Sequence, residues 1–320
     1  MRALEPRNSF AVINPHDEVR VHVEQFGPVD AGTASAGPVD AGPADAGPAD
    51  ARRTVLLLPT WSLVHSRVWK MQVPFLVQRG YQVIAFDGRG NGLSGRPSKG
   101  YATADFVRDL ETVLDHLPLR SAVLAGFSAG GRWAIQFAAQ HPERVEQLIL
   151  IAPATFIDGS PRVRLSSFTE APPDREGWNK YNAVHWREDY RDFVRWFAQQ
   201  IFTEPHSTKG QDDIVEWAES GTPEMLIETV LDSANPRLGE YWRATSCPTL
   251  IVHGSDDAVM PVANSRFLQE ARPETRLAVL EGAGHAPHIR DAVKSNLLIA
   301  EFLESYAHQP FVARRVHARA

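Results

Sequence analysis

The sequence reads AVLAGFSAGGRWAIQFAAQ over residues 122–140. Its first six residues are small or apolar, which is typical of a strand buried on both faces of a sheet. The remainder, from Ala129 onward, has the apolar spacing of an amphipathic helix. Gly126, Ser128 and Gly130 form a G-x-S-x-G pattern at the junction. In this context the pattern predicts a sharp strand-to-helix turn that exposes the serine.

The turn has a chemical consequence for Ser128. Its hydroxyl stands at the N-terminus of the helix, where backbone amides and the helix dipole favour a developing negative charge. We expect a strained backbone at Ser128, with Gly126 and Gly130 leaving space where side chains would collide. Ser128 is therefore the candidate nucleophile. The pattern alone would also suit a serine that only caps the helix between two glycines.

Apolar runs bounded by turn residues recur on both sides of this segment. Each run is typical of a buried parallel strand, and helical patterns lie between the runs. Strand–helix alternation with short links predicts an α/β fold with a mostly parallel, doubly wound sheet. The predicted strands are 18–26, 55–58, 82–86, 122–127, 147–151, 249–253 and 276–280, and the predicted helices are 67–79, 103–117, 129–140, 264–270 and 293–306.

Residues 158–243 break the alternation. They lack a strong strand pattern, hold five of the eight tryptophans, and show helical patterns at 187–201 and 212–234. We predict a helical cap inserted between two parts of one core, 1–157 and 244–320. Most tryptophans of such an insertion are expected to pack in its interior rather than to contact a ligand.

A repetitive segment lies within the first part of the core. Residues 27–51 contain G-P-V-D-A and G-P-A-D-A pentads, in which proline recurs every fifth residue over most of the segment. Proline prevents regular helix, and small residues offer nothing to bury. We expect an enlarged surface loop between two neighbouring strands.

Composition narrows the class of protein. The chain of 320 residues carries a net charge of −6, which gives no basic face for a nucleic acid or a membrane surface. Its one cysteine, Cys247, allows neither an intramolecular disulfide nor a cysteine-based metal site. The sequence also shows no signal-peptide pattern and no apolar run of membrane-spanning length. We expect a cytoplasmic protein without nucleic-acid or membrane partners.

Two loops after later strands supply partners for a serine. A glycine-rich turn after the last strand carries His285, a base suited to neutral pH, with His288 as the nearby alternative. The loop after the preceding strand carries Asp256 and Asp257, and an acid there would orient the histidine. We choose Asp257 and expect the other carboxylate to cap a turn. His253, at the strand end, is expected to be a packed residue.

The order Ser128, Asp257, His285 matches one known triad topology. With these motifs the chain resembles the α/β-hydrolase superfamily, in its lidded, esterase-like branch. The segment 87–94 resembles the D-x-R-G-x-G-x-S loop of that branch. The acid loop G-x-x-D-x-x-x-P, which favours Asp257, and the histidine loop G-x-G-H-x-P are similar as well. More narrowly, the stretches 58–62, 86–92 and 181–207 resemble actinobacterial hydrolase domains that are sometimes fused to nucleotide cyclases.

The resemblance implies an oxyanion hole formed by the backbone amides of Ala129 and Trp61. Many relatives carry His-Gly where this chain has Pro59-Thr60. Threonine resists backbone geometries that glycine permits, so the departure bears on the Trp61 donor. The Trp61 ring could line an acyl pocket or pack in the core.

The sequence therefore predicts a serine hydrolase that cleaves carbonyl esters through an acyl-enzyme. The tryptophan-rich cap favours a small-molecule substrate with an apolar group, and no metal or organic cofactor is implied. Cleavage of a carbon–carbon bond, a thioester or a lactone stays open, as do haloperoxidase-like or perhydrolase side activity and a non-catalytic ligand receptor. Dehalogenases and epoxide hydrolases are disfavoured, because they carry aspartate where Ser128 stands.

Overall fold

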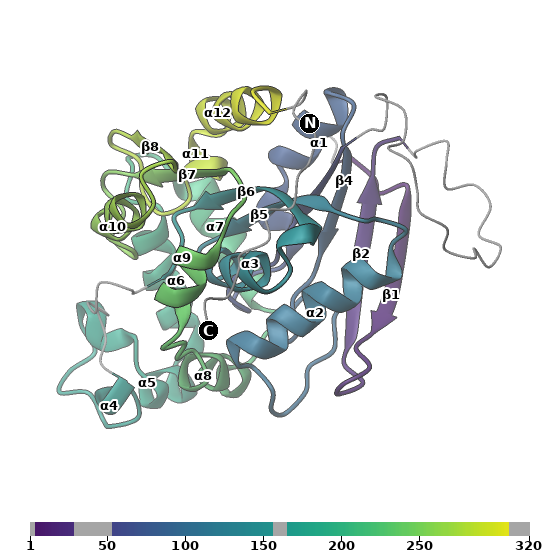
Figure 1. Cartoon of the computed structure of the whole chain (residues 1–320). Coiled ribbons are helices and arrows are strands. Elements are labelled where there is room, and N and C mark those ends of the chain that lie inside the picture. Colours follow the sequence, from purple (N-terminus) through teal and green to yellow (C-terminus); the bar gives the residue numbers. More distant parts are fainter. Residues whose placement is uncertain (1–3, 29–52, 156–164, 307–320) are drawn as a thin grey trace.

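The computed structural model describes residues 4–28, 53–155 and 165–306. Eight strands form one sheet in the order β1-β2-β4-β3-β5-β6-β7-β8 (Figure 1). The six strands β3 to β8 run parallel to one another, whereas β1 and β2 are antiparallel to their neighbours. Their bounds are β1 Asn8–Ile13, β2 Arg20–Phe26, β3 Thr54–Leu57, β4 Gln82–Phe86, β5 Ala122–Phe127, β6 Val145–Ile151, β7 Thr249–Gly254 and β8 Arg276–Leu280.

Helices cover both faces of the sheet, which confirms the doubly wound α/β fold. Alternate residues of a strand point to opposite faces. Leu56 therefore belongs to the core with α2 and α3, and Leu57 belongs to the core with α1 and α12. The helices of this part are η1 Ser66–Trp69, α1 Gln72–Gln78, α2 Thr103–His116, α3 Ala129–Gln140, η2 Pro142–Arg144, α10 Ala263–Ala271, α11 Pro287–Arg290 and α12 Ala292–Glu304.

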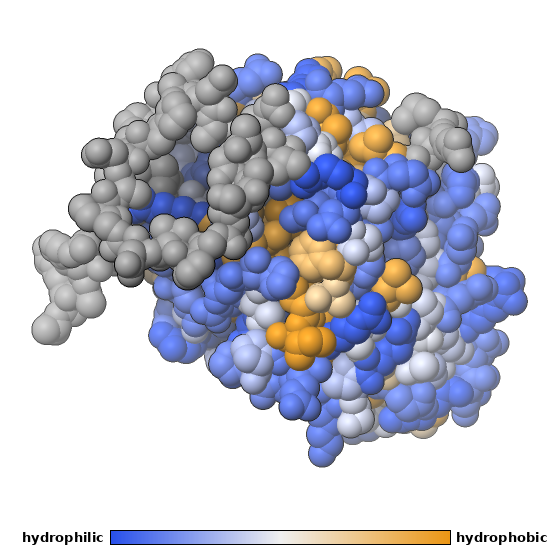
Figure 2. Space-filling view, turned by 90° about the vertical axis from the view of Figure 1, so that its right-hand side faces the viewer, coloured by the Kyte–Doolittle hydropathy of each residue, from blue (hydrophilic) through white to orange (hydrophobic). Residues whose placement is uncertain are grey.

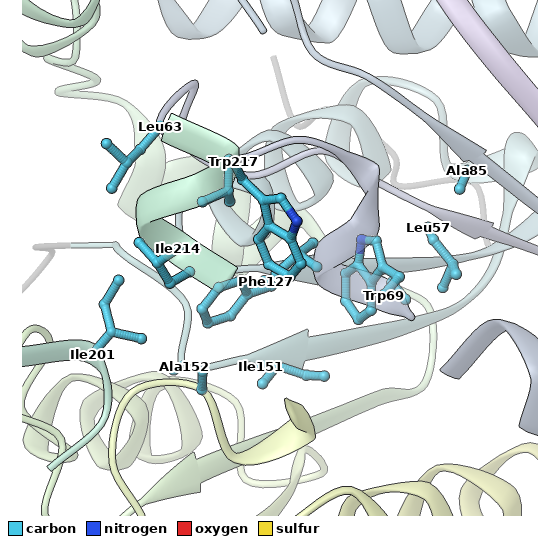
Figure 3. Packing of buried hydrophobic residues seen from close by; sticks show 14 of the residues in the cluster. Leu57, Leu63, Trp69, Ala85, Phe127, Ile151, Ala152, Ile201, Ile214 and Trp217 are labelled. Carbon is cyan, nitrogen blue, oxygen red and sulfur yellow. The ribbon is translucent and has the colours of Figure 1, made fainter. Parts of the chain in front are cut away.

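Between β6 and β7 the described chain is helical. This helical segment comprises α4 Leu165–Phe168, η3 Gly177–Lys180, α5 Ala183–Glu188, α6 Tyr190–Ile201, α7 Thr208–Ala218, α8 Pro223–Leu231 and α9 Leu238–Ala244. Figure 3 shows how it joins the core: Phe127, the last residue of β5, lies among Trp69, Ile214 and Trp217. Trp186, Trp217 and Trp242 are buried, as expected for packing residues.

Several sequence predictions differ from the structure in detail; the helix predicted over 187–201, for example, begins at Tyr190 as α6. The strand Asn8–Ile13 was missed, because an edge strand that is largely exposed carries little apolar signal. The helix predicted over 67–79 is η1 followed by α1, since Pro74 is tolerated only in a first turn. The helix predicted over 212–234 is α7 and α8, because Pro223 starts a new helix. Almost all of the repetitive loop 27–51 lies outside the described residues.

The face of the molecule on the side of β1 and β2 is mostly hydrophilic, with apolar side chains gathered near its centre (Figure 2). A small group of exposed apolar residues is usual on the surface of a globular protein. In the part of the chain that the structure describes, every helix is too short or too polar to cross a membrane.

Candidate active site

Ser128 lies between β5 and α3 with backbone angles φ 51° and ψ −116°, a strained conformation for a residue other than glycine. The glycines beside it are required by close contacts. A Cβ atom on Gly126 would lie 2.5 Å from the carbonyl oxygen of Gly130. A Cβ atom on Gly130 would lie 2.2 Å from the carbonyl oxygen of Pro59. Neither of the two glycine positions therefore has room for a side chain.

The turn brings Ser128 to His285, which follows β8. Nε2 of His285 lies 3.0 Å from Oγ of Ser128, and Nδ1 lies 2.7 Å from Oδ2 of Asp257. The carboxylate favours the tautomer with its proton on Nδ1, so Nε2 is free to accept the serine hydroxyl proton. The residue after β5, one from the loop after β7 and one from the loop after β8 thus form one hydrogen-bonded chain.

Asp257 is buried and held on both oxygens. Its Oδ1 accepts hydrogen bonds from the amides of Val259 and Met260, at 2.8 and 2.7 Å. Burial by itself would raise the pKa of the carboxyl, but the charge of His285 and hydrogen bonds from His285 and His253 outweigh it. The pKa of Asp257 is consequently held well below its usual range, and the group is a carboxylate at neutral pH.

His253 contributes to this arrangement in a way that the sequence did not reveal. Its Nε2 lies 2.8 Å from the carbonyl oxygen of Met260, which can only accept, so the proton is on Nε2. The same atom lies 3.0 Å from Oδ2 of Asp257. Nδ1 then accepts a hydrogen bond from the Ser265 hydroxyl at 2.6 Å. His253 is packed, as predicted, and it also faces the carboxylate.

The two alternatives weighed from the sequence lie elsewhere. Asp256 is exposed, and its side chain accepts a hydrogen bond from the Ser255 hydroxyl. His288 is fully buried in α11 against Phe127 and Trp69, with ring centroids 4.5 and 5.1 Å away. Burial, followed by the charge of His285, lowers the pKa of His288 to about 3. The ring is therefore neutral at physiological pH and does not contact Ser128 within the described structure.

The backbone after β3 forms the opposite side of the site. Trp61 and Ala129 both line the cavity in front of Ser128. Neither Thr60 nor Trp61 has a positive φ, so the backbone at these positions does not adopt a conformation that favours glycine. Ser62 donates to the carbonyl oxygen of Arg89, and Asn91 donates to the carbonyl oxygen of Ser62. The D-x-R-G-x-G-x-S loop thereby fixes the Trp61 turn.

The cavity has a volume of about 480 Å³ and lies between the sheet and the helical segment. The Trp61 ring serves both roles considered for it: it lines the cavity and packs against Tyr181 and Phe197. Its indole donates a hydrogen bond of 2.6 Å to Thr229 in α8. Most of the wall is apolar, and it includes Trp61, Phe168, Tyr181, Phe197, Val230 and Leu238.

Arg132 is a polar wall residue that the sequence analysis did not single out. Arg132 lies in the first turn of α3, four residues after Ser128, the residue that caps this helix, and both side chains line the cavity. That spacing was the signal that could have found it. In the described ranges, no group of three His, Cys, Asp or Glu side chains is placed to hold a metal ion.

Comparisons with known proteins agree with this architecture. A non-heme haloperoxidase of Rhodococcus erythropolis is 30% identical over 260 residues, which cover 79% of this chain and 93% of that protein. A bromoperoxidase from Bacillus anthracis has a TM-score of 0.74 at 22% identity, covering 93% of this chain and 100% of the other. The esterase EaEST from Exiguobacterium antarcticum has a TM-score of 0.72 at 21% identity, covering 92% and 98%.

The family model described as alpha/beta hydrolase fold matches residues 53–292, three quarters of the chain. The matched range includes β3 to β8, the Ser128 turn and both partner loops. The resemblance expected from the motifs is confirmed at the level of the family: this chain belongs to the alpha/beta hydrolase fold family.

Proposed function

We propose that the protein is a serine hydrolase that cleaves carboxylic esters of small molecules. The observation that carries the proposal is the hydrogen-bonded chain from Ser128 through His285 to Asp257. Such a chain lets a neutral serine attack a carbonyl at physiological pH. The name of the structurally similar esterase is in line with this reaction class.

In this mechanism His285 accepts the proton of Ser128 as the serine oxygen attacks the ester carbonyl. Asp257 orients the imidazole and stabilises its cation. The amides of Ala129 and Trp61 donate hydrogen bonds to the oxyanion. His285 then protonates the departing alcohol, which leaves an acyl group on Ser128. Water, deprotonated by the same base, releases the acid and regenerates the serine.

The cap over this site would be residues 158–243, which hold α4 to α8 and all but the last residue of α9. It supplies Phe168, Tyr181 and Phe197 to the cavity wall, so we expect a substrate with an apolar group next to the ester. The core would then comprise 1–157 and 244–320. Cys247 is a buried free thiol, which suits the reducing cytoplasm in which we place the protein.

Perhydrolysis is a second candidate activity, suggested by the haloperoxidase names of two similar proteins. Hydrogen peroxide would replace water as the nucleophile that attacks the acyl group on Ser128. The products would be a peracid and the free serine. The branch occurs after acylation, so the same residues serve both outcomes. Esterase assays with and without added peroxide, with the peracid trapped by bromide, measure the partition.

The test of the main proposal is a fluorophosphonate probe, which phosphonylates activated serines, read out by intact mass. We expect one adduct on the wild type, none on Ser128→Ala, and a strongly reduced rate on His285→Gln. Ser233→Ala is the matched control, because Ser233 also lines the cavity but donates to the carbonyl of Val230. A wild type that stays unlabelled, or an adduct that persists on Ser128→Ala, would overturn the proposal.

A further inference from the structure

Arg132 lines the cavity as a buried cation for which the described residues supply no ion-pair partner. Its side chain leaves the residue only 9% exposed, and its Nε atom has no hydrogen-bond partner. Among the described residues, no carboxylate forms an ion pair with it. Burial lowers the pKa of Arg132 to about 10, which still leaves the guanidinium charged at neutral pH. A charge removed from water in this way is strongly unfavourable unless something compensates for it.

In the described chain, the charges of the other buried arginines are compensated by carboxylates of the protein itself. Arg89 binds Asp109 through two nitrogens, at 2.7 and 2.6 Å, and also binds Asp17 at 2.7 Å. Arg272 pairs with Glu274 at 3.0 Å and donates to the carbonyl oxygen of Cys247 at 3.3 Å. Arg132 differs from both because its polar end faces the cavity rather than a partner. The described part of the fold therefore supplies carboxylates to Arg89 and Arg272 but not to Arg132.

The polar groups of the cavity wall around Arg132 suit an anionic ligand. Arg132 is the one charged residue among the described residues that line the cavity. The Oγ1 hydroxyl of Thr155, also on the wall, is buried without a hydrogen-bond partner. The positive charge of Arg132 opposes the rise that burial causes in the pKa of the Tyr181 hydroxyl. Nε of Arg132 and the hydroxyl of Thr155, both without a hydrogen-bond partner in the described structure, thus share one apolar pocket with Ser128.

We infer that the substrate carries a carboxylate, which binds Arg132 while Ser128 attacks an ester carbonyl of the same molecule. This inference rests on the proposed function and deepens it. A single cation balances a single negative charge, which favours a carboxylate over a phosphate dianion. The four-residue spacing in α3 separates the two Cα atoms by about 6 Å along the helix. The substrate class is therefore an ester of a short dicarboxylic acid with one carboxyl free, its hydrocarbon chain lying on the aromatic wall.

The decisive measurement compares two esters of equal chain length, monomethyl adipate and methyl hexanoate, by methanol release. We expect the wild type to favour the anionic ester in kcat/KM. Arg132→Met should lower the ratio of anionic to neutral kcat/KM by about tenfold to a hundredfold, the effect of losing a charge-assisted hydrogen bond. Arg132→Lys should keep part of the preference. Arg243→Met, at an exposed position in α9, is the matched control and should keep the wild-type ratio.

Thermal stability is the second readout, because it tests whether Arg132 has only a structural role. Because Arg132 has no ion-pair partner among the described residues, Arg132→Met should not lower Tm, and its reaction with the neutral fluorophosphonate should persist. A fall in Tm together with an unchanged ester ratio would mean a structural role and would overturn the inference. A wild type that is labelled at Ser128 but shows no preference for monomethyl adipate overturns the inference and leaves the hydrolase proposal standing.

The inference can also be tested if the hydrolase proposal fails. Binding of monomethyl adipate to Ser128→Ala, measured by calorimetry, does not depend on turnover. We expect binding that is weakened about tenfold or more in Ser128→Ala/Arg132→Met, with methyl hexanoate affected little. Equal binding to the single and the double variant would overturn the carboxylate site.

Discussion

Replacing His288 with phenylalanine should flatten the acid dependence of stability. His288 is buried against Phe127 and Trp69. Burial, followed by the charge of His285, lowers its folded-state pKa to about 3, against 6.5 for the exposed group. Between these two values the unfolded chain binds a proton that the folded chain does not. His288 therefore makes stability fall as the pH falls from 6.5 toward 3.

The magnitude follows from the slope of about 1.4 kcal/mol per pH unit for one proton. From pH 7.5 to pH 4.5 the loss accumulates to about 2.5 kcal/mol, because the unfolded group begins to titrate only near pH 6.5. Phenylalanine keeps an apolar ring in the site and takes up no proton. The difference in free energy of unfolding between His288→Phe and the wild type should therefore grow by that amount over the range.

The assay is urea unfolding followed by tryptophan fluorescence at four pH values between 7.5 and 4.5. The eight tryptophans give a strong signal. His16→Gln is the control, since His16 is exposed and should retain the wild-type slope. Parallel pH profiles for His288→Phe and the wild type would refute the argument, whatever the constant offset between them, because the offset reports packing and the slope reports the proton.

Three further predictions concern the site. Asp257→Asn should lower kcat on the order of 10⁴-fold, because the amide favours the wrong imidazole tautomer, whereas Asp256→Asn should stay near the wild type; equal losses in ester hydrolysis would contradict the assignment. His253→Leu should lower kcat/KM about tenfold by removing a charge-assisted hydrogen bond to Asp257, and an unchanged value would show that the contact is only structural packing. Gly130→Ala should lower the free energy of unfolding by about 1–3 kcal/mol, since its Cβ would lie 2.2 Å from the Pro59 carbonyl oxygen; a stability equal to the wild type in urea would refute the steric argument.

Much of the architecture followed from local pattern. The five parallel strands from 82 to 280 and the helix Ala129–Gln140 were predicted with ends within two residues of those observed. Buried parallel strands can be predicted from the sequence because they are apolar on both faces. The edge strand Asn8–Ile13 escaped prediction for the opposite reason, since exposure removes the apolar signal.

The sequence by itself determined the strand–turn–helix around Ser128. The glycines there are required because a side chain would collide with nearby backbone atoms of the same turn or of the neighbouring loop. It also placed His285 and two aspartates after successive strands, which parallel topology brings to one edge. Only the tertiary structure decided which aspartate reaches His285, at 2.7 Å, and that His253 approaches the same oxygen. It alone showed Arg132 unpaired in the cavity. Asp257 and His285 lie 28 residues apart on different loops. Which side chains meet there, and which remain unpaired, depends on tertiary packing that no local pattern encodes.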